Sequence, residues 1–170
     1  TRWILFPKEA KRIFSHSVAS MFFGAIPMGL ATILNGFLAF GISFWGNNAI
    51  SIAETLWWID MAMAIIIGVF IPFFMFTRQD HSMEKMTAVW LLPVVAAEVA
   101  AASAGLLVPH LSNGHQAIIL ILGYVLWGIS VPIAMSILVI LLLRLMLHKL
   151  PHKEMAASTF LSLGPIGTGA

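Results

Sequence analysis

Long apolar stretches, separated by short polar segments, occupy most of the chain. They cover about residues 17–41, 55–76, 87–108 and 116–143, and a fifth runs from about 154 to 170. Each of the first four is long enough to cross a bilayer as an α-helix, which takes about 20 apolar residues. The pattern therefore predicts an all-α membrane protein, with four transmembrane helices and the start of a fifth in a single domain over residues 1–170.

Three of these stretches are interrupted by proline. The motifs are Ile26-Pro27-Met28-Gly29, Leu92-Pro93 and Gly164-Pro165-Ile166-Gly167. Proline removes a backbone N–H from the helical ladder, and the carbonyl freed by it cannot face lipid without a cost of several kcal/mol. We therefore expect kinks or distortions at these prolines, on the side of each helix that faces other helices or a water-filled path. We also expect Gly29 and Gly167 to permit close backbone approach there.

Small and polar side chains mark one side of the first stretch. Most of them are typical of helix packing, because small residues let backbones approach. Thr32 and Asn35 are better candidates for lining a path, since a buried amide needs a partner. The predicted path-lining set is Pro27, Gly29, Thr32, Asn35, Pro93, Glu98, Gly164, Pro165 and Gly167.

The charged residues predict the topology. Only 9% of the residues are charged, against about 25% in soluble domains. If residues 1–15 approach the membrane from the cytoplasm, every lysine and arginine falls in an inside segment, as the positive-inside rule requires. The inside segments are then 1–15, 77–86 and 144–154, and the outside segments are 46–54 and 109–115.

Other chemistry finds little support in the sequence. There is no cysteine, no zinc-protease motif and no nucleophile elbow. Asp80, His81 and Glu84 are typical of solvated charge in a loop, and Asp60 is expected near the membrane interface, hydrated or bonded to a neighbour. We predict no catalytic residue, no metal and no cofactor. The chain has no initiator methionine and stops within an apolar stretch, so we expect a fragment of a longer protein.

Several motifs occur in order along nearly the whole chain. They are His16-Ser17, MFFGAIPMG from Met21, LWWID from Leu56, Asp80-His81-Ser82, MTAVWLLP from Met86, YVLWG from Tyr124, and Leu163-Gly164-Pro165. Together they resemble the tellurite-resistance/dicarboxylate transporter family, which includes fungal malate permeases, fungal sulfite efflux pumps, the bacterial tellurite-resistance channel and the plant guard-cell slow anion channel. The resemblance is strongest to the malate and sulfite branch.

The resemblance implies ten spans, arranged as five helical hairpins around a central pore that the kinked odd-numbered helices line. This chain would hold spans three to six and the start of span seven. The helix that carries the family's gate would lie outside it. The resemblance also implies a homotrimer in the plasma (inner) membrane.

The implied function is transmembrane transport of an anion, either a four-carbon dicarboxylate such as malate or a sulfite-like or tellurite-like oxyanion. The implied partners are this small anion and the lipid bilayer, with no nucleic acid. A non-transporting scaffold or sensor is the alternative, and a membrane enzyme is a further one. Channel and proton-coupled transporter also stay open, although an inside-negative potential favours anion efflux by roughly 2.3 kcal/mol per charge per 100 mV.

Glu98 is the ionisable residue of the third stretch, in a run of small residues near mid-membrane depth. A charged side chain at a helix centre costs about 2.5–3.5 kcal/mol on insertion scales, so Glu98 should face protein or water. An ionised carboxylate would repel a passing anion, whereas a protonated one could donate a hydrogen bond to it. Two interpretations remain open. Glu98 either is protonated during passage and couples transport to protons, or bonds a neighbouring helix for assembly.

The topology can be tested by cysteine labelling, because the chain has no cysteine of its own. We expect Asn48→Cys to react with a membrane-impermeant thiol reagent added outside intact cells, and Ser82→Cys to react only after permeabilisation. Labelling of Ser82→Cys in intact cells would invert the predicted orientation.

Overall fold

The computed structural model describes residues 13–14, 16–151 and 153–169, and it is helical throughout its spans. Four helical runs are long and apolar enough to cross a membrane: Ala19–Trp45, Asn47–Thr77, Ala88–His110 and Gly114–His148. The predicted all-α membrane fold is therefore confirmed. Most of the predicted cytoplasmic approach, residues 1–12 and 15, lies outside the described residues.

The helical runs are of two kinds. The long helices α5 (Asn47–Thr77) and α7 (Asn113–His148) are continuous α-helices that pass through Pro72 and Pro132. The other runs change helix type along their length. The first is η1 (Ala19–Gly24), α3 (Ala25–Gly36), η2 (Phe37–Gly41) and α4 (Ile42–Trp45); the second is η3 (Ala88–Leu91), α6 (Leu92–Leu107) and η4 (Val108–His110); the third is α8 (Lys153–Ala156), η5 (Ala157–Ser162) and α9 (Leu163–Thr168).

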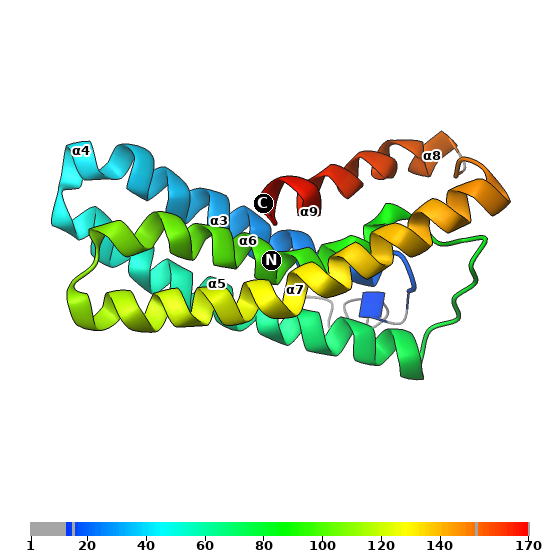
Figure 1. The fold of residues 1–170 in the computed structure, drawn as a ribbon, viewed down its shortest axis with the longest axis horizontal. Helices are drawn as coiled ribbons and strands as arrows, with labels where there is room; N and C mark the ends of the chain where they lie inside the picture. Colours follow the sequence, from blue (N-terminus) through cyan, green and yellow to red (C-terminus); the bar gives the residue numbers. More distant parts are fainter. Residues whose placement is uncertain (1–12, 15, 152, 170) are drawn as a thin grey trace.

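Helix α6 is the centre of the arrangement, because it contacts α3, α5, α7 and α9. Figure 1 shows α3 and α9 along one side of α6, with the long helices α5 and α7 along the other. We call α3, α6 and α9 the inner helices, and α5 and α7 the outer helices. A stripe of alanines at every fourth position of α6, Ala96, Ala100 and Ala104, is buried at 0–1% exposure. Such small side chains let the neighbouring helices approach closely.

Each inner helix begins with a 3₁₀ turn, and its proline stands in the first turn of the α-helix that follows. η1 leads to Pro27, η3 to Pro93 and η5 to Pro165. The first α-helical turn tolerates proline because its N–H groups have no partner within the helix. The predicted distortion is thus present at each proline, in the form of a change of helix type.

The carbonyls freed by these prolines are satisfied within their own helices. In an α-helix, Val89 O would accept a bond from residue 93, which is proline; here it accepts the N–H of Leu92. In the same way Phe23 O shares the N–H of Ala25, and Leu161 O shares the N–H of Leu163. An earlier N–H thus reaches each freed carbonyl, and Pro27, Pro93 and Pro165 themselves are buried in the described chain.

The first outer helix starts earlier than the sequence predicted. Residues 46–54 were expected as a loop, but the reversal takes place at Gly46, which has φ 53°, and α5 begins at Asn47. Glycine adopts this conformation without steric cost, so one residue is enough to reverse the chain. Asp60 consequently lies in the interior of the span.

Close backbone approach occurs at a different glycine from the two expected. An ideal Cβ on Gly24 would overlap the Leu92 carbonyl and lie 2.8 Å from Pro93 N, whereas Gly29 and Gly167 have nothing within 4 Å in the described chain. The prediction for Gly29 and Gly167 was therefore wrong. The first two inner helices come closest at Gly24, the last residue of η1, which lies against Leu92, the first residue of α6. Gly29 lies five residues further along the chain.

Gly24→Ala is expected to lower the free energy of unfolding of the full-length protein by about 1–3 kcal/mol, because the new methyl group meets backbone that cannot turn away. Thermal unfolding in detergent measures the effect. Gly128→Ala is the matched control, since nothing lies within 4 Å of a Cβ at Gly128. Equal unfolding temperatures for the two variants would contradict the contact at Gly24.

Candidate functional site

The predicted path-lining residues divide into buried and exposed groups. Pro27, Pro93, Pro165 and Glu98 are buried, and Asn35 is half-buried. Gly29, Thr32, Gly164 and Gly167 are exposed in the described chain, all on the inner helices α3 and α9. The structure therefore leaves one side of these two helices open, and this open side is the candidate site.

The open side of α3 and α9 is nearly uncharged. Thr32 uses its hydroxyl within its own helix, where Oγ1 donates to Gly29 O over 2.6 Å. Among the described residues of α3 and α9 there is no lysine, arginine, histidine, aspartate or glutamate. The exposed residues of these two helices include glycines, Thr32 and large apolar side chains, among them Ile33 and Ile166.

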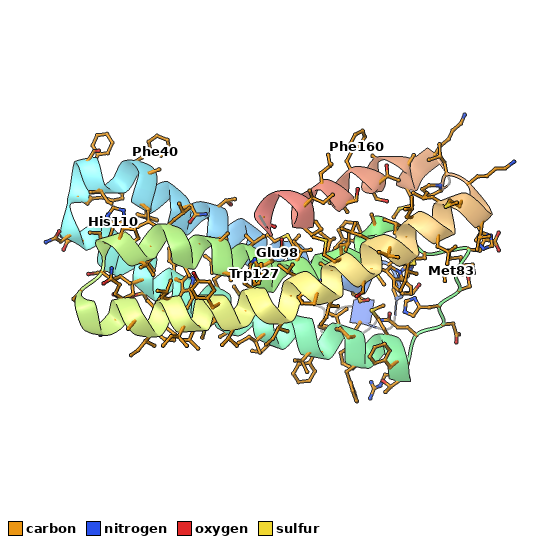
Figure 2. The ribbon with its side chains drawn as sticks, viewed as in Figure 1. Phe40, Met83, Glu98, His110, Trp127 and Phe160 are labelled. Carbon is orange, nitrogen blue, oxygen red and sulfur yellow. The ribbon has the colours of Figure 1, made fainter. Side chains whose placement is uncertain are left out.

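Glu98 meets the end of the third inner helix. Thr168 Oγ1 lies 2.5 Å from Glu98 Oε1, and an ideal Cβ on Gly169 would lie 3.0 Å from the same oxygen. Glu98 is 0% exposed, and its second oxygen, Oε2, has no hydrogen-bond partner in the described chain. The hydroxyl of Ser130, on α7, also lies beside this carboxyl. Figure 2 shows Glu98 close to Trp127, where α6, α7 and α9 meet.

Asn35 joins two inner helices. Its Nδ2 donates to Ser103 Oγ of α6 over 3.1 Å, and its Oδ1 is buried without a partner in the described chain. The expectation that the amide has a partner is confirmed on its nitrogen side. Of the predicted set, Asn35 and Glu98 are the two that bridge inner helices through their side chains.

The outer helices donate side-chain hydrogen bonds to the backbone of the inner helices. Trp57 Nε1 of α5 donates to Ala100 O over 2.9 Å. Ser130 Oγ of α7 donates to Val94 O over 2.8 Å, and Trp127 Nε1 of α7 donates to Gly169 O over 3.1 Å. The sequence alone does not show that the N–H groups of Trp57 and Trp127 reach across to a neighbouring backbone, because this depends on how the helices pair.

Asp60 was placed wrongly by the sequence. It is 0% exposed within α5, and neither carboxyl oxygen has a hydrogen-bond partner among the described residues. The expectation of a hydrated side chain does not agree with this burial, and because α5 begins at Asn47, Asp60 lies more than three turns inside the helix. A signal was present, since Asp60 continues the buried stripe of Ala49, Ala53, Trp57 and Ala64 at steps of three and four.

The loop after α5 ties two inner helices together at one end. Gln79 Nε2 donates to Ser20 Oγ over 3.0 Å and to Phe14 O over 2.8 Å, and its Oε1 bonds His81 Nε2 over 3.0 Å. The ring of His81 meets Trp90 of η3 edge-on, with centroids 5.0 Å apart. Within the described residues, no three His, Asp or Glu side chains converge on a metal site, and His81 faces Gln79 and Trp90.

A second tie at the same end uses a buried cation. Arg144 of α7 is 4% exposed; its Nη1 donates to Lys149 O over 2.6 Å and its Nη2 to Glu84 O over 2.7 Å. Lys149 follows the last residue of α7 with φ 62°. The carbonyl oxygens and the negative end of the α7 dipole compensate the guanidinium charge. This end of the bundle is therefore held by backbone acceptors.

Comparison with known proteins agrees with this architecture. A family model described as SLAC1, voltage-dependent anion channel, matches residues 1–170. The sulfite efflux pump SSU1 of Arthroderma otae is 45% identical over 170 residues, which cover 99% of this chain and 45% of the pump. The uncharacterized transporter MJ0576 of Methanocaldococcus jannaschii is 25% identical over 169 residues, covering 99% of this chain and 47% of the relative. No solved structure matches the chain significantly.

The chain belongs to the voltage-dependent anion channel family, because the family model covers all of it. The resemblance inferred from the motifs is thereby confirmed, and the chain is an integral membrane protein of a channel and transporter family. It spans less than half the length of the curated relatives it matches.

The contacts of His81, in the loop after α5, predict a dependence of stability on pH. Burial lowers the pKa of His81 below its ordinary 6.5, and the Asp80 carboxylate offsets this in part. The folded protein thus binds this proton less readily than the unfolded chain. The contribution of His81 is complete above pH 6.5 and is lost as the pH falls from 6.5 through the lower folded value.

His81→Gln is expected to remove this part of the acid destabilisation, as measured by unfolding temperature against pH. Gln79 can still receive a hydrogen bond from the glutamine amide. His148→Gln is the control, because His148 is exposed. Parallel pH profiles for wild type and His81→Gln would contradict the assignment.

Proposed function

We propose that this chain forms part of a transmembrane anion transporter, with the open side of α3 and α9 facing the anion path. The observation that carries the proposal is the repeated inner helix, with a 3₁₀ turn before each proline, in a chain matched over its full length by an anion channel family. Such a helix keeps its backbone satisfied while it presents small residues to a polar path. A non-transporting scaffold or sensor would need neither feature.

Sulfite is the anion we propose. Three fungal relatives named as sulfite efflux pumps are 45% identical over 99% of this chain. An uncharged path suits a small oxyanion that must leave as readily as it enters. We place the protein in the plasma membrane as a homotrimer with residues 1–15 in the cytoplasm, so that an inside-negative potential drives the anion outward.

We further propose that Glu98 holds a proton when the anion passes. Ser130 has one hydroxyl hydrogen, which it donates to Val94 O, so it has none left for the Glu98 carboxyl. Thr168 likewise has one hydrogen for two acceptors, Gly164 O at 2.9 Å and Glu98 Oε1. A protonated Glu98 can donate to either hydroxyl. An ionised one would be buried with a single donor and without a cation.

Transport is tested with the full-length protein in liposomes loaded with sulfite. We expect sulfite release in response to an imposed potential, well above that of liposomes without protein. Malate-loaded liposomes test the dicarboxylate alternative in the same assay. Release of neither anion would refute transport and favour the scaffold or sensor.

Glu98→Gln is expected to fold, because the amide keeps the shape and can donate to the same hydroxyls. If Glu98 couples transport to protons, the anion flux of the Glu98→Gln variant loses the pH dependence that the wild type shows between about pH 5 and 8. Glu84→Gln is the control, since Glu84 is exposed in the loop. A pH profile identical to wild type would leave Glu98 with a purely structural role.

A further inference from the structure

Asp60 is a buried acid that has no role in the proposed anion path. It lies on α5, an outer helix, and no described residue donates a hydrogen bond to either of its oxygens. Five elements packed against α5, namely η1, α3, η2, α4 and α6, contain no lysine, arginine or histidine in their described residues, and Glu98 of α6 is their one titratable side chain. α7 also reaches α5, where His115 Nδ1 lies 2.6 Å from Glu54 Oε1, almost two helical turns from Asp60. An ionised Asp60 would be an unpaired charge in the interior of a span.

The two outer helices repeat a pattern that gives Asp60 a counterpart. In α5, Trp57 stands three residues before Asp60; in α7, Trp127 stands three residues before Ser130. Each tryptophan donates its indole N–H to the inner run that follows in the chain, Trp57 to Ala100 O within α6 and Trp127 to Gly169 O, directly after α9. Asp60 therefore occupies in the first hairpin the position that Ser130 occupies in the second.

Ser130 shows what this position does. Its hydroxyl donates to Val94 O of α6, the inner helix that precedes α7 in the chain, and Val94 is the residue after Pro93. The inner helix that precedes α5 is α3, and the residue after its proline, Pro27, is Met28. By this repeat, the Met28 carbonyl is the counterpart of the acceptor that Ser130 uses.

The helix register independently agrees with this pairing. Ala49 of α5 packs against Gly41, with its Cβ 3.2 Å from an ideal Cβ on that glycine. The two helices run in opposite directions, so moving along α5 from Ala49 to Asp60 corresponds to moving back from Gly41 to Leu30. Leu30 is two residues from Met28, about 3 Å of helix rise. A side chain of aspartate length can span this offset.

We propose that Asp60 retains its proton and donates it in a hydrogen bond to the Met28 carbonyl, as Ser130 donates to Val94 O. The carboxylic acid serves as a hydroxyl here, and Asp60 is a positioning residue that holds the distorted start of the first inner helix against α5. The effect on flux rests on the proposed transport function. The hydrogen bond itself does not.

Substitutions at both positions of the repeat test the proposal in the full-length protein. Asp60→Asn and Asp60→Ser keep a donor and no charge, so their unfolding temperatures should stay within about 2 °C of wild type. Asp60→Leu removes the donor and should lower the unfolding temperature by about 2–8 °C, as expected for one buried hydrogen bond. Ser130→Asp should unfold at nearly the temperature of wild type. Ser130→Ala removes the donor, so its unfolding temperature should be lowered by about as much as that of Asp60→Leu.

Infrared difference spectroscopy reads the proton directly. The wild-type spectrum at neutral pH should contain a protonated carboxyl band that disappears in Asp60→Asn, while the Glu98→Gln spectrum retains it. Identical carboxyl bands in wild type and Asp60→Asn would overturn the proposal. So would an Asp60→Asn variant as unstable as Asp60→Leu, since that result would require the charge.

Flux separates this inference from the function on which it builds. If the wild type carries sulfite, Asp60→Ser should retain most of the flux and Asp60→Leu should lose about tenfold or more. If the wild type carries none, the transport function fails, and the carboxyl band and the unfolding temperatures still decide whether Asp60 is a protonated donor.

Discussion

The rest of the structure depends on one constraint, which is that every backbone carbonyl inside the membrane needs a donor. Proline withholds that donor from the carbonyl four residues earlier, and each inner helix contains a proline. In all three runs a 3₁₀ segment precedes the proline and an earlier N–H reaches the carbonyl. Val89 O accepts the N–H three residues on, whereas Phe23 O and Leu161 O each share the N–H two residues on. The prolines can therefore shape a span without leaving an unsatisfied group in lipid.

The outer helices complete the arrangement by donating to inner backbone. Trp57, Trp127 and Ser130 each direct a side-chain hydrogen to a carbonyl of α6 or α9. A helical carbonyl has two lone pairs, so it accepts such a bond in addition to its own helical one. These contacts hold α6 and the end of the third inner run against the outer helices.

The sequence predicted what depends on composition and missed what depends on neighbours. Apolar length predicted the spans, and proline predicted where Pro27, Pro93 and Pro165 distort them. The earlier N–H that bonds each freed carbonyl was not predictable, because apolar periodicity does not show which backbone N–H reaches which carbonyl. Gly24 was missed in favour of Gly29 because the crossing point of two helices decides which glycine is approached. The burial of Asp60 was missed because α5 begins directly after Gly46, so Asp60 lies well inside the helix and not near the end of a loop.

An anion path without cations has a physical rationale in this arrangement. The described residues of α3 and α9 carry no charge, and α6 adds only Glu98, which is buried between α7 and α9. A lysine or arginine on the open side would bind an oxyanion tightly in a low-dielectric setting and slow its release. Neutral groups bind more weakly, so the path we propose along α3 and α9 would favour rapid passage over retention. Glu98 is buried beside this side, so a proton on its carboxyl would remove a negative charge from the vicinity of the proposed path.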